Sequence, residues 1–390
     1  MDHETLMVAF YDALDVYGEP IEGKDAAELA AKLLRYSPVQ RWMALRNRDA
    51  SSRLNVLHSL LTLVKAERTA PPARALALAG LGVEVAMGMR VRLPQGPVLA
   101  DFRAQALAEW ANALRRSERY RAAASVWKRV HHQLELGTGD PALQAELQRL
   151  EATLCLSQQR LPEAIRLLRE SLPTLADLGR PDLASLAQVM LGIALLRLGR
   201  YDEAAVTTRA ALSKAVEGGD SQLCLRAFHN LVLIKAEAGE LEGAAALLVR
   251  LAPLYKAAED PLLNLRAEWV AGRLGAHWQE WRGAAERFEV VRQGFVDLGL
   301  AYDASLVSLE LAIAYLHQGR AAKVKALAQE MYPVFIAQEI PREASAALLL
   351  FVEAAERKAA TIKSVSSLLE KLKNRLAPKS RRGSQGRFVT

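Results

Sequence analysis

The stretch from Pro181 to Asp220, PDLASLAQVMLGIALLRLGRYDEAAVTTRAALSKAVEGGD, decides the fold because it is one complete copy of a repeat. Its central turn carries the large residue Tyr201, and Ala204 follows three residues later. Turn residues of this kind return at intervals of 41, 40, 40, 40 and 40 residues. Such a period is typical of stacked supersecondary units and not of one closed globule. The six turn residues are Tyr120, Leu161, Tyr201, Leu241, Trp281 and Ala321.

Each repeat divides into two helical stretches. In the quoted copy, apolar residues at helical spacing predict helices over residues 182–198 and 202–217, with a turn between them. Pro141, Pro181, Pro261 and Pro341 are separated by multiples of 40 residues. Each lies at an expected helix start, where a missing N–H costs nothing. The sequence therefore predicts an all-α fold.

The small residues around the turn resemble a known pattern. Gly192 lies nine residues before Tyr201, Gly199 two before it and Ala204 three after it. This arrangement resembles the tetratricopeptide repeat (TPR), and the resemblance covers residues 100–340. The period exceeds the usual 34 residues by about six, as in the longer repeats of bacterial regulators and adaptors. The resemblance implies a right-handed α-solenoid of antiparallel helix pairs, a TPR-like superhelix.

The regions that flank the repeats have weaker patterns, and positive charge gathers at the C-terminal end. The formal net charge is +7, and the last twenty residues hold seven Lys and Arg without an acid, so the rest of the chain is neutral. We expect five regions: a helical cap (1–49), a degenerate helix pair (50–99), six repeats (100–340), capping helices (341–376) and a disordered basic tail (377–390).

Several classes of protein are disfavoured by what the sequence lacks. The segment from Met1 to Glu4 is acidic and polar and no signal peptide follows, so we expect a cytoplasmic protein. The most apolar stretch, from Ala75 to Met89, is too short to span a bilayer. Cys155 and Cys224 form no paired framework. Phosphate-binding loops, metal-ligand clusters and nucleophile motifs are also missing. We therefore expect no enzyme, no cofactor, no metal and no membrane partner.

The resemblance to TPR arrays implies that the first helix of each repeat lines a concave groove. Counting back from each turn residue gives a set that is basic and polar with one large aromatic, so we expect acidic residues to lie elsewhere and the partner to be an acidic or carboxylate-ended peptide. The alternative interpretation of this set is that its arginines are ordinary exposed residues and that its Trp packs between repeats. The candidate partner-binding residues are Asn112, Arg115, Arg116, Arg149, Arg226, His229, Asn230, Arg266, Trp269, Arg273 and His277, with Ile193, Arg197, Leu309, Ile313, Leu316 and His317 as their counterparts in other repeats.

The function that these patterns favour is a non-catalytic scaffold or adaptor in bacterial regulation. One alternative is a nucleic-acid-associated factor that uses the basic tail, since arginines and lysines attract polyanions. The only aromatic residue there, Phe388, argues against base stacking, and many such tails are simply solvated. Another alternative is a sensor of a small ligand or peptide. The candidate polyanion-binding residues are Lys379, Arg381, Arg382 and Arg387.

Overall fold

The computed structural model describes residues 23–46, 50–68, 71–89, 96–258, 260–337, 351–352 and 361–373. Within these ranges every regular element is an α-helix, so the expected all-α fold is confirmed. The basic tail, Pro341 and the first 22 residues lie outside the described residues. The helices are α2 (Gly23–Arg35), α3 (Pro38–Arg46), α4 (Ala50–Ala66), α5 (Pro72–Gly88), α6 (Gly96–Arg116), α7 (Tyr120–Glu135), α8 (Pro141–Ser157), α9 (Leu161–Asp177), α10 (Pro181–Arg197), α11 (Tyr201–Glu217), α12 (Ser221–Glu237), α13 (Leu241–Ala257), α14 (Pro261–His277), α15 (Trp281–Asp297), α16 (Ala301–His317), α17 (Ala321–Ala337) and α19 (Ile362–Lys373).

The helices repeat with one length and one spacing. Each helix from α8 to α17 is 17 residues long, and each starts 20 residues after the previous one. The six turn residues all begin the second helix of a repeat, and Pro141, Pro181 and Pro261 begin first helices. The sequence placed each turn residue within the turn, whereas the structure makes it the first helical residue. The 40-residue period therefore contains two helix–link modules of equal length.

Several links end a helix in the same way, and Gly199 is the clearest example. Its φ is +78°, the left-handed region that glycine adopts without a Cβ penalty. Arg200 N donates to Leu195 O at 2.9 Å and Gly199 N to Leu196 O at 3.0 Å, which is a Schellman motif. Gln279 occupies the equivalent place with a φ of +64°. A side chain is strained in this conformation, so glycine is the residue that suits the position.

Glycine also lets the two helices of a repeat approach closely. A Cβ on Gly192 would lie 2.2 Å from Thr208 Oγ1, and a Cβ on Gly272 would lie 2.7 Å from the ring of Phe288. Thr208 and Phe288 belong to second helices and are buried. The glycine nine residues before the turn is therefore a packing position.

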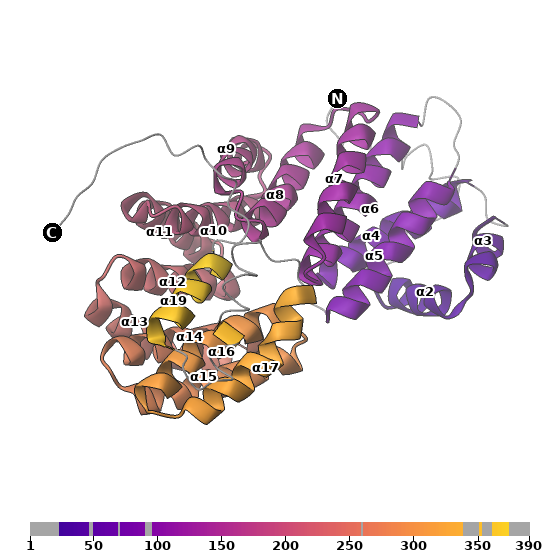
Figure 1. Cartoon of the computed structure of the whole chain (residues 1–390). Coiled ribbons are helices and arrows are strands. Elements are labelled where there is room, and N and C mark those ends of the chain that lie inside the picture. Colours follow the sequence, from indigo (N-terminus) through magenta and orange to yellow (C-terminus); the bar gives the residue numbers. More distant parts are fainter. Residues whose placement is uncertain are drawn as a thin grey trace, which may run out of the picture. The chain divides into compact units, whose positions relative to one another are not determined.

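The chain forms two compact bodies, and we describe each by itself. The N-terminal body comprises residues 1–157 and 163–187, and the C-terminal body comprises residues 158–162 and 188–390. In the N-terminal body, α2, α4, α5 and α6 pack around a core that includes Leu57 and Leu60. In the C-terminal body, α15, α16, α17 and α19 (orange to yellow in Figure 1) enclose Phe288, Phe295 and Phe351. Both bodies are built from consecutive helices that pack on their neighbours.

Candidate partner-binding surface

Side chains connect the first helices of successive repeats in the C-terminal body. Asn230 Nδ2 on α12 donates to Val189 O on α10 at 3.3 Å. Arg273 Nη2 on α14 donates to Glu237 Oε1 on α12 at 2.9 Å. Trp269 Nε1 on α14 donates to Glu310 Oε2 on α16 at 2.6 Å. The first helices therefore form one layer, and the predicted residues of this body lie on it.

One residue per repeat lies half-exposed on this layer, eight positions before the turn residue. These residues are Ile193 on α10, Leu233 on α12, Arg273 on α14 and Ile313 on α16. Because they have the same place on successive first helices, the four form a row along this layer. We call the exposed and half-exposed side of the first helices of the C-terminal body the inner face. It is aliphatic at three positions of the row and cationic at one.

Trp269 and Arg273 are held by acidic residues of the neighbouring repeats. Glu310 is only 7% exposed and accepts the Trp269 N–H, while the Trp269 ring packs edge-on against Phe295 with centroids 5.7 Å apart. Burial alone would lower the pKa of Arg273, but Glu310 and Glu237 raise it above its ordinary value. The expectation that acids lie elsewhere is therefore wrong at Arg273. In the free chain this arginine already has carboxylate partners.

Three of the predicted residues are buried and cannot meet a partner that rests on the surface. Arg149 is 3% exposed, His229 4% and Asn230 5%. His229 Nδ1 shares a hydrogen bond of 2.9 Å with the Tyr255 hydroxyl on α13. Burial, and then the nearby Arg266, lower the pKa of His229 to about 4, so this ring is neutral at ordinary pH. We leave these three residues out of the candidate surface.

The remaining basic candidates of the C-terminal body, Arg226, Arg266 and His277, are accessible, whereas their counterpart Leu309 is buried in the core. Arg226 has a side chain that is 40% exposed, and its Nη2 lies 3.6 Å from Asp260 Oδ2. Arg266 and His277 are both exposed on α14. Among the described residues, Arg266 has no carboxylate within ion-pair distance. The inner face thus carries two accessible arginines that differ from Arg273 in their surroundings.

The predicted residues of the N-terminal body belong to a separate network. Arg115 on α6 donates from Nη2 to Asn112 Oδ1 at 2.9 Å and from Nη1 to Ser157 Oγ on α8 at 3.4 Å. Burial lowers the pKa of Arg116. Burial, and then Arg68, lower the pKa of Arg149 to about 10. Its Nε and Nη2 have no hydrogen-bond partner among the described residues.

Two buried carboxylates beside Arg149 compensate for this charge. Arg68, which follows α4, is paired with Glu109 on α6 and with Glu146 on α8, where Arg68 Nη2 lies 3.0 Å from Glu146 Oε1. Burial alone would raise the pKa of Glu146, but Lys65 and Arg68 lower it to about 2. Unpaired buried charges are strongly destabilising, so this network holds α4, α6 and α8 together. We interpret it as structural.

Sequence reasoning missed Leu233 and the carboxylates, although the period contained the signal. Leu233 lies eight residues before Leu241, the same offset as Ile193, Arg273 and Ile313 from their turn residues. Glu109 and Glu310 both lie eleven residues before a turn residue. A comparison of all repeats at the position eleven residues before the turn would have drawn attention to Glu109 and Glu310.

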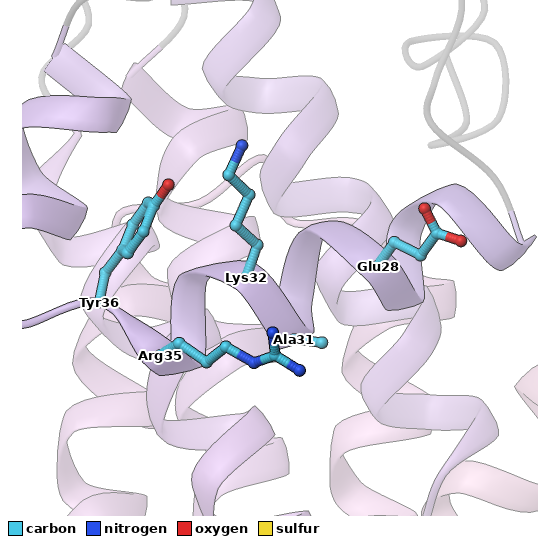
Figure 2. Close-up of a pocket in the computed structure, with 5 residues that line it drawn as sticks. All are labelled: Glu28, Ala31, Lys32, Arg35 and Tyr36. Carbon is cyan, nitrogen blue, oxygen red and sulfur yellow. The ribbon is translucent and has the colours of Figure 1, made fainter.

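A shallow depression on α2 offers little to bind. Figure 2 shows that Glu28, Ala31, Lys32, Arg35 and Tyr36 line it, and all five come from α2 and the residue that follows it. Its volume of about 480 Å³ is open to solvent on a single helix surface. No group of three or more potential metal ligands occurs in the described part of the chain. None of the described helices is long and apolar enough to cross a membrane.

The fold and its inner face define an all-helical repeat protein. No protein-family model matches the chain, and no curated protein matches it in sequence. Among solved structures, a Rap protein complexed with Competence and Sporulation Factor is similar with a TM-score of 0.64 and 10% identity, over 82% of this chain and 87% of that chain. Aspartyl phosphate phosphatase F from Bacillus subtilis is similar with a TM-score of 0.53 and 13% identity, over 94% and 96% of the two chains.

The Rap conjugation gene regulator of the plasmid pLS20, in complex with the Phr* peptide, has a TM-score of 0.50 and 11% identity, over 83% of this chain and 98% of that chain. Identities this low establish the fold alone. The chain is a TPR-type helical repeat protein by its fold.

Proposed function

We propose that this protein is a non-catalytic adaptor of bacterial regulation that works in the cytoplasm and holds a protein or peptide partner on the inner face. The observation that carries this proposal is the regular row of Ile193, Leu233, Arg273 and Ile313, which offers one half-exposed side chain per repeat. An extended peptide can contact such a row at successive side chains, and TPR arrays use their first helices in this way. Of the similar structures, the pLS20 regulator is a complex with the Phr* peptide and a Rap protein is a complex with Competence and Sporulation Factor, which supports a partner of this kind.

The test compares two matched pairs of substitutions. Leu233→Gln with Ile313→Gln changes the inner face, and Val249→Gln with Val290→Gln changes second helices, where the two valines are 73% and 62% exposed. Each protein is used for affinity capture from nuclease-treated lysate, and circular dichroism and melting confirm that it is folded. We expect one stoichiometric protein or peptide to be captured by the wild type and the outer pair and lost by the inner pair. Equal capture by all three would refute the inner face as the binding surface.

The nucleic-acid alternative is tested in the same assay. A chain that ends at Leu376 lacks the basic residues Lys379, Arg381, Arg382 and Arg387. Capture that survives this truncation and nuclease treatment supports the adaptor. Capture that disappears with either treatment favours the polyanion reading, because phosphate contacts dominate such binding.

A catalytic role is a second candidate because one similar structure is a phosphatase by name. We favour a non-catalytic role, since Glu237 on the inner face and the buried Glu310 beside it are engaged by Arg273 and Trp269. Incubation of the captured partner with the protein, followed by mass spectrometry, tests this. A partner that leaves with unchanged mass supports the adaptor, and loss of a phosphate would overturn it.

A further inference from the structure

Two arginines on the inner face have the same place in neighbouring repeats. Arg226 on α12 and Arg266 on α14 both lie fifteen residues before a turn residue. The equivalent residue on α16 is Leu306, which is 8% exposed. Both arginine side chains are accessible, at 40% for Arg226 and in the exposed range for Arg266. Both arginines therefore present positive charge to solvent from neighbouring first helices.

Asp260 forms an ion pair with Arg226 and also has a second role. Asp260 caps the start of α14, where its Oδ1 accepts the Leu263 N–H at 3.0 Å. Its Oδ2 lies 3.6 Å from Arg226 Nη2, which is beyond hydrogen-bond distance. Arg266 has no ion pair among the described residues, and its neighbour Glu268 is engaged by Arg287. Arg273 differs, because its Nη2 already donates a hydrogen bond to Glu237 at 2.9 Å and Glu310 lies on its other side.

His229 is a common neighbour of the two arginines. It lies three residues after Arg226, and residues at this spacing share one face of a helix. Arg266 acts on the same ring from α14, because its charge contributes to the lowered pKa of His229. Packed helices lie about 8–10 Å apart, which two extended arginine side chains can bridge. The guanidinium groups of both arginines can therefore contact one group of a ligand that lies over His229.

We propose that Arg226 and Arg266 together bind one oxyanion, a carboxylate or a phosphate group, carried by the partner of the inner face. This inference rests on the proposed function and adds the chemistry of one contact. A guanidinium group offers two parallel N–H donors that match the oxygens of either anion. The aliphatic row provides apolar contacts, and the arginine pair fixes where the negative group of the partner lies.

A first experiment uses inorganic phosphate and acetate as probes and needs no identified partner. The proteins are wild type, Arg226→Gln with Arg266→Gln, and Arg282→Gln, whose arginine is 88% exposed on α15 and paired with Glu286. NMR of the arginine Nε–H and histidine ring signals should show saturable shifts at Arg226 and Arg266. The pKa of His229 should rise, because the anion offsets the charge of Arg266. The Arg282→Gln protein should respond like the wild type, and the double variant should not respond.

Equal shifts at Arg282 and at the pair, or a response without saturation, would mean ionic screening and would overturn the site. Loss of the response in the double variant with retention in the Arg282→Gln protein supports it. Melting curves of the three proteins show whether the substitutions leave the fold intact.

A second experiment separates this inference from the proposed function. Affinity for the captured partner should fall by about tenfold to a hundredfold in the double variant, the range typical of lost charged hydrogen bonds. If the Leu233→Gln, Ile313→Gln protein loses the partner while the double variant binds normally, the adaptor stands and the oxyanion site is wrong. If neither change weakens binding, the proposed function itself fails.

The same assay identifies the source of the anion. Phosphatase treatment of the partner removes binding if the group is a phosphate. Amidation of its C-terminus, or Asp→Asn and Glu→Gln changes, remove binding if the group is a carboxylate. Binding that survives all of these treatments would overturn the proposal.

Discussion

Acidification should destabilise the C-terminal body through one buried side chain, His229. The ring is 4% exposed, and its pKa falls from an ordinary 6.5 to about 4 in the folded chain. Well above pH 6.5 the ring is neutral in the folded and unfolded states, so it has no effect on stability there. Between pH 6.5 and 4 the unfolded state binds a proton that the folded state excludes, so stability falls as the pH falls.

The size of this effect follows from the shift in the pKa of His229. A difference of one pKa unit corresponds to about 1.4 kcal/mol, so a shift from 6.5 to about 4 gives roughly 2 to 3 kcal/mol at pH 4.5 relative to pH 7.5. Because His229 is almost fully buried, solvent screening removes little of it. Other groups also titrate in this range, so the contribution of His229 has to be isolated by substitution.

The assay is urea unfolding at about pH 7.5 and pH 4.5, followed by hydrogen exchange of the amides in α12 and α13. The wild type is compared with His229→Gln, whose amide stays neutral and can still bond to the Tyr255 hydroxyl. Subtracting the two pH dependences cancels the other titrating groups. We expect the wild type to lose roughly 2 to 3 kcal/mol more than the variant. Parallel pH dependences in the two proteins would refute the reasoning.

Two further predictions concern the helix links and the packing glycines. Gln279→Gly should stabilise the chain by about 0.5–1 kcal/mol, because it removes a left-handed side chain, while Gly199→Ala should destabilise it by about 1 kcal/mol. Urea unfolding measures both, and a loss of stability in the glycine variant would contradict the strain argument. Gly272→Ala should cost about 1–2 kcal/mol because its Cβ meets Phe288, whereas the control Gly283→Ala, with nothing within 4 Å, should gain about 0.5–1 kcal/mol. Thermal melting that moves in the same direction for both alanine variants would argue against this difference.

The helix pattern could be predicted from the sequence because its signals are local. Pro181 marks a helix start and Gly199 a helix end, and each acts through its own backbone. The same two signals recur in other repeats, so helix boundaries were within a residue or two of the observed ones. The division into two bodies had no such signal in the repeat pattern.

The candidate site was harder to predict, because exposure depends on how neighbouring repeats pack. Arg149, His229 and Trp269 share one offset, twelve residues before the turn residue, and all three are buried or partly buried against other helices. A single helix cannot reveal this, since polar residues usually indicate exposure. The pairing of Arg273 with Glu237 and Glu310 joins three repeats. It could be recognised only once the register between those repeats was known.

The uniform links have a consequence for how this protein can change over evolutionary time. From α8 to α17 each link has three residues, so no connection in this span is itself long enough to form a binding loop. Duplication or deletion of a 40-residue block would keep every remaining helix in phase with its neighbours. New recognition properties would then come from point substitutions on the helices, and the length of the surface would change by whole repeats.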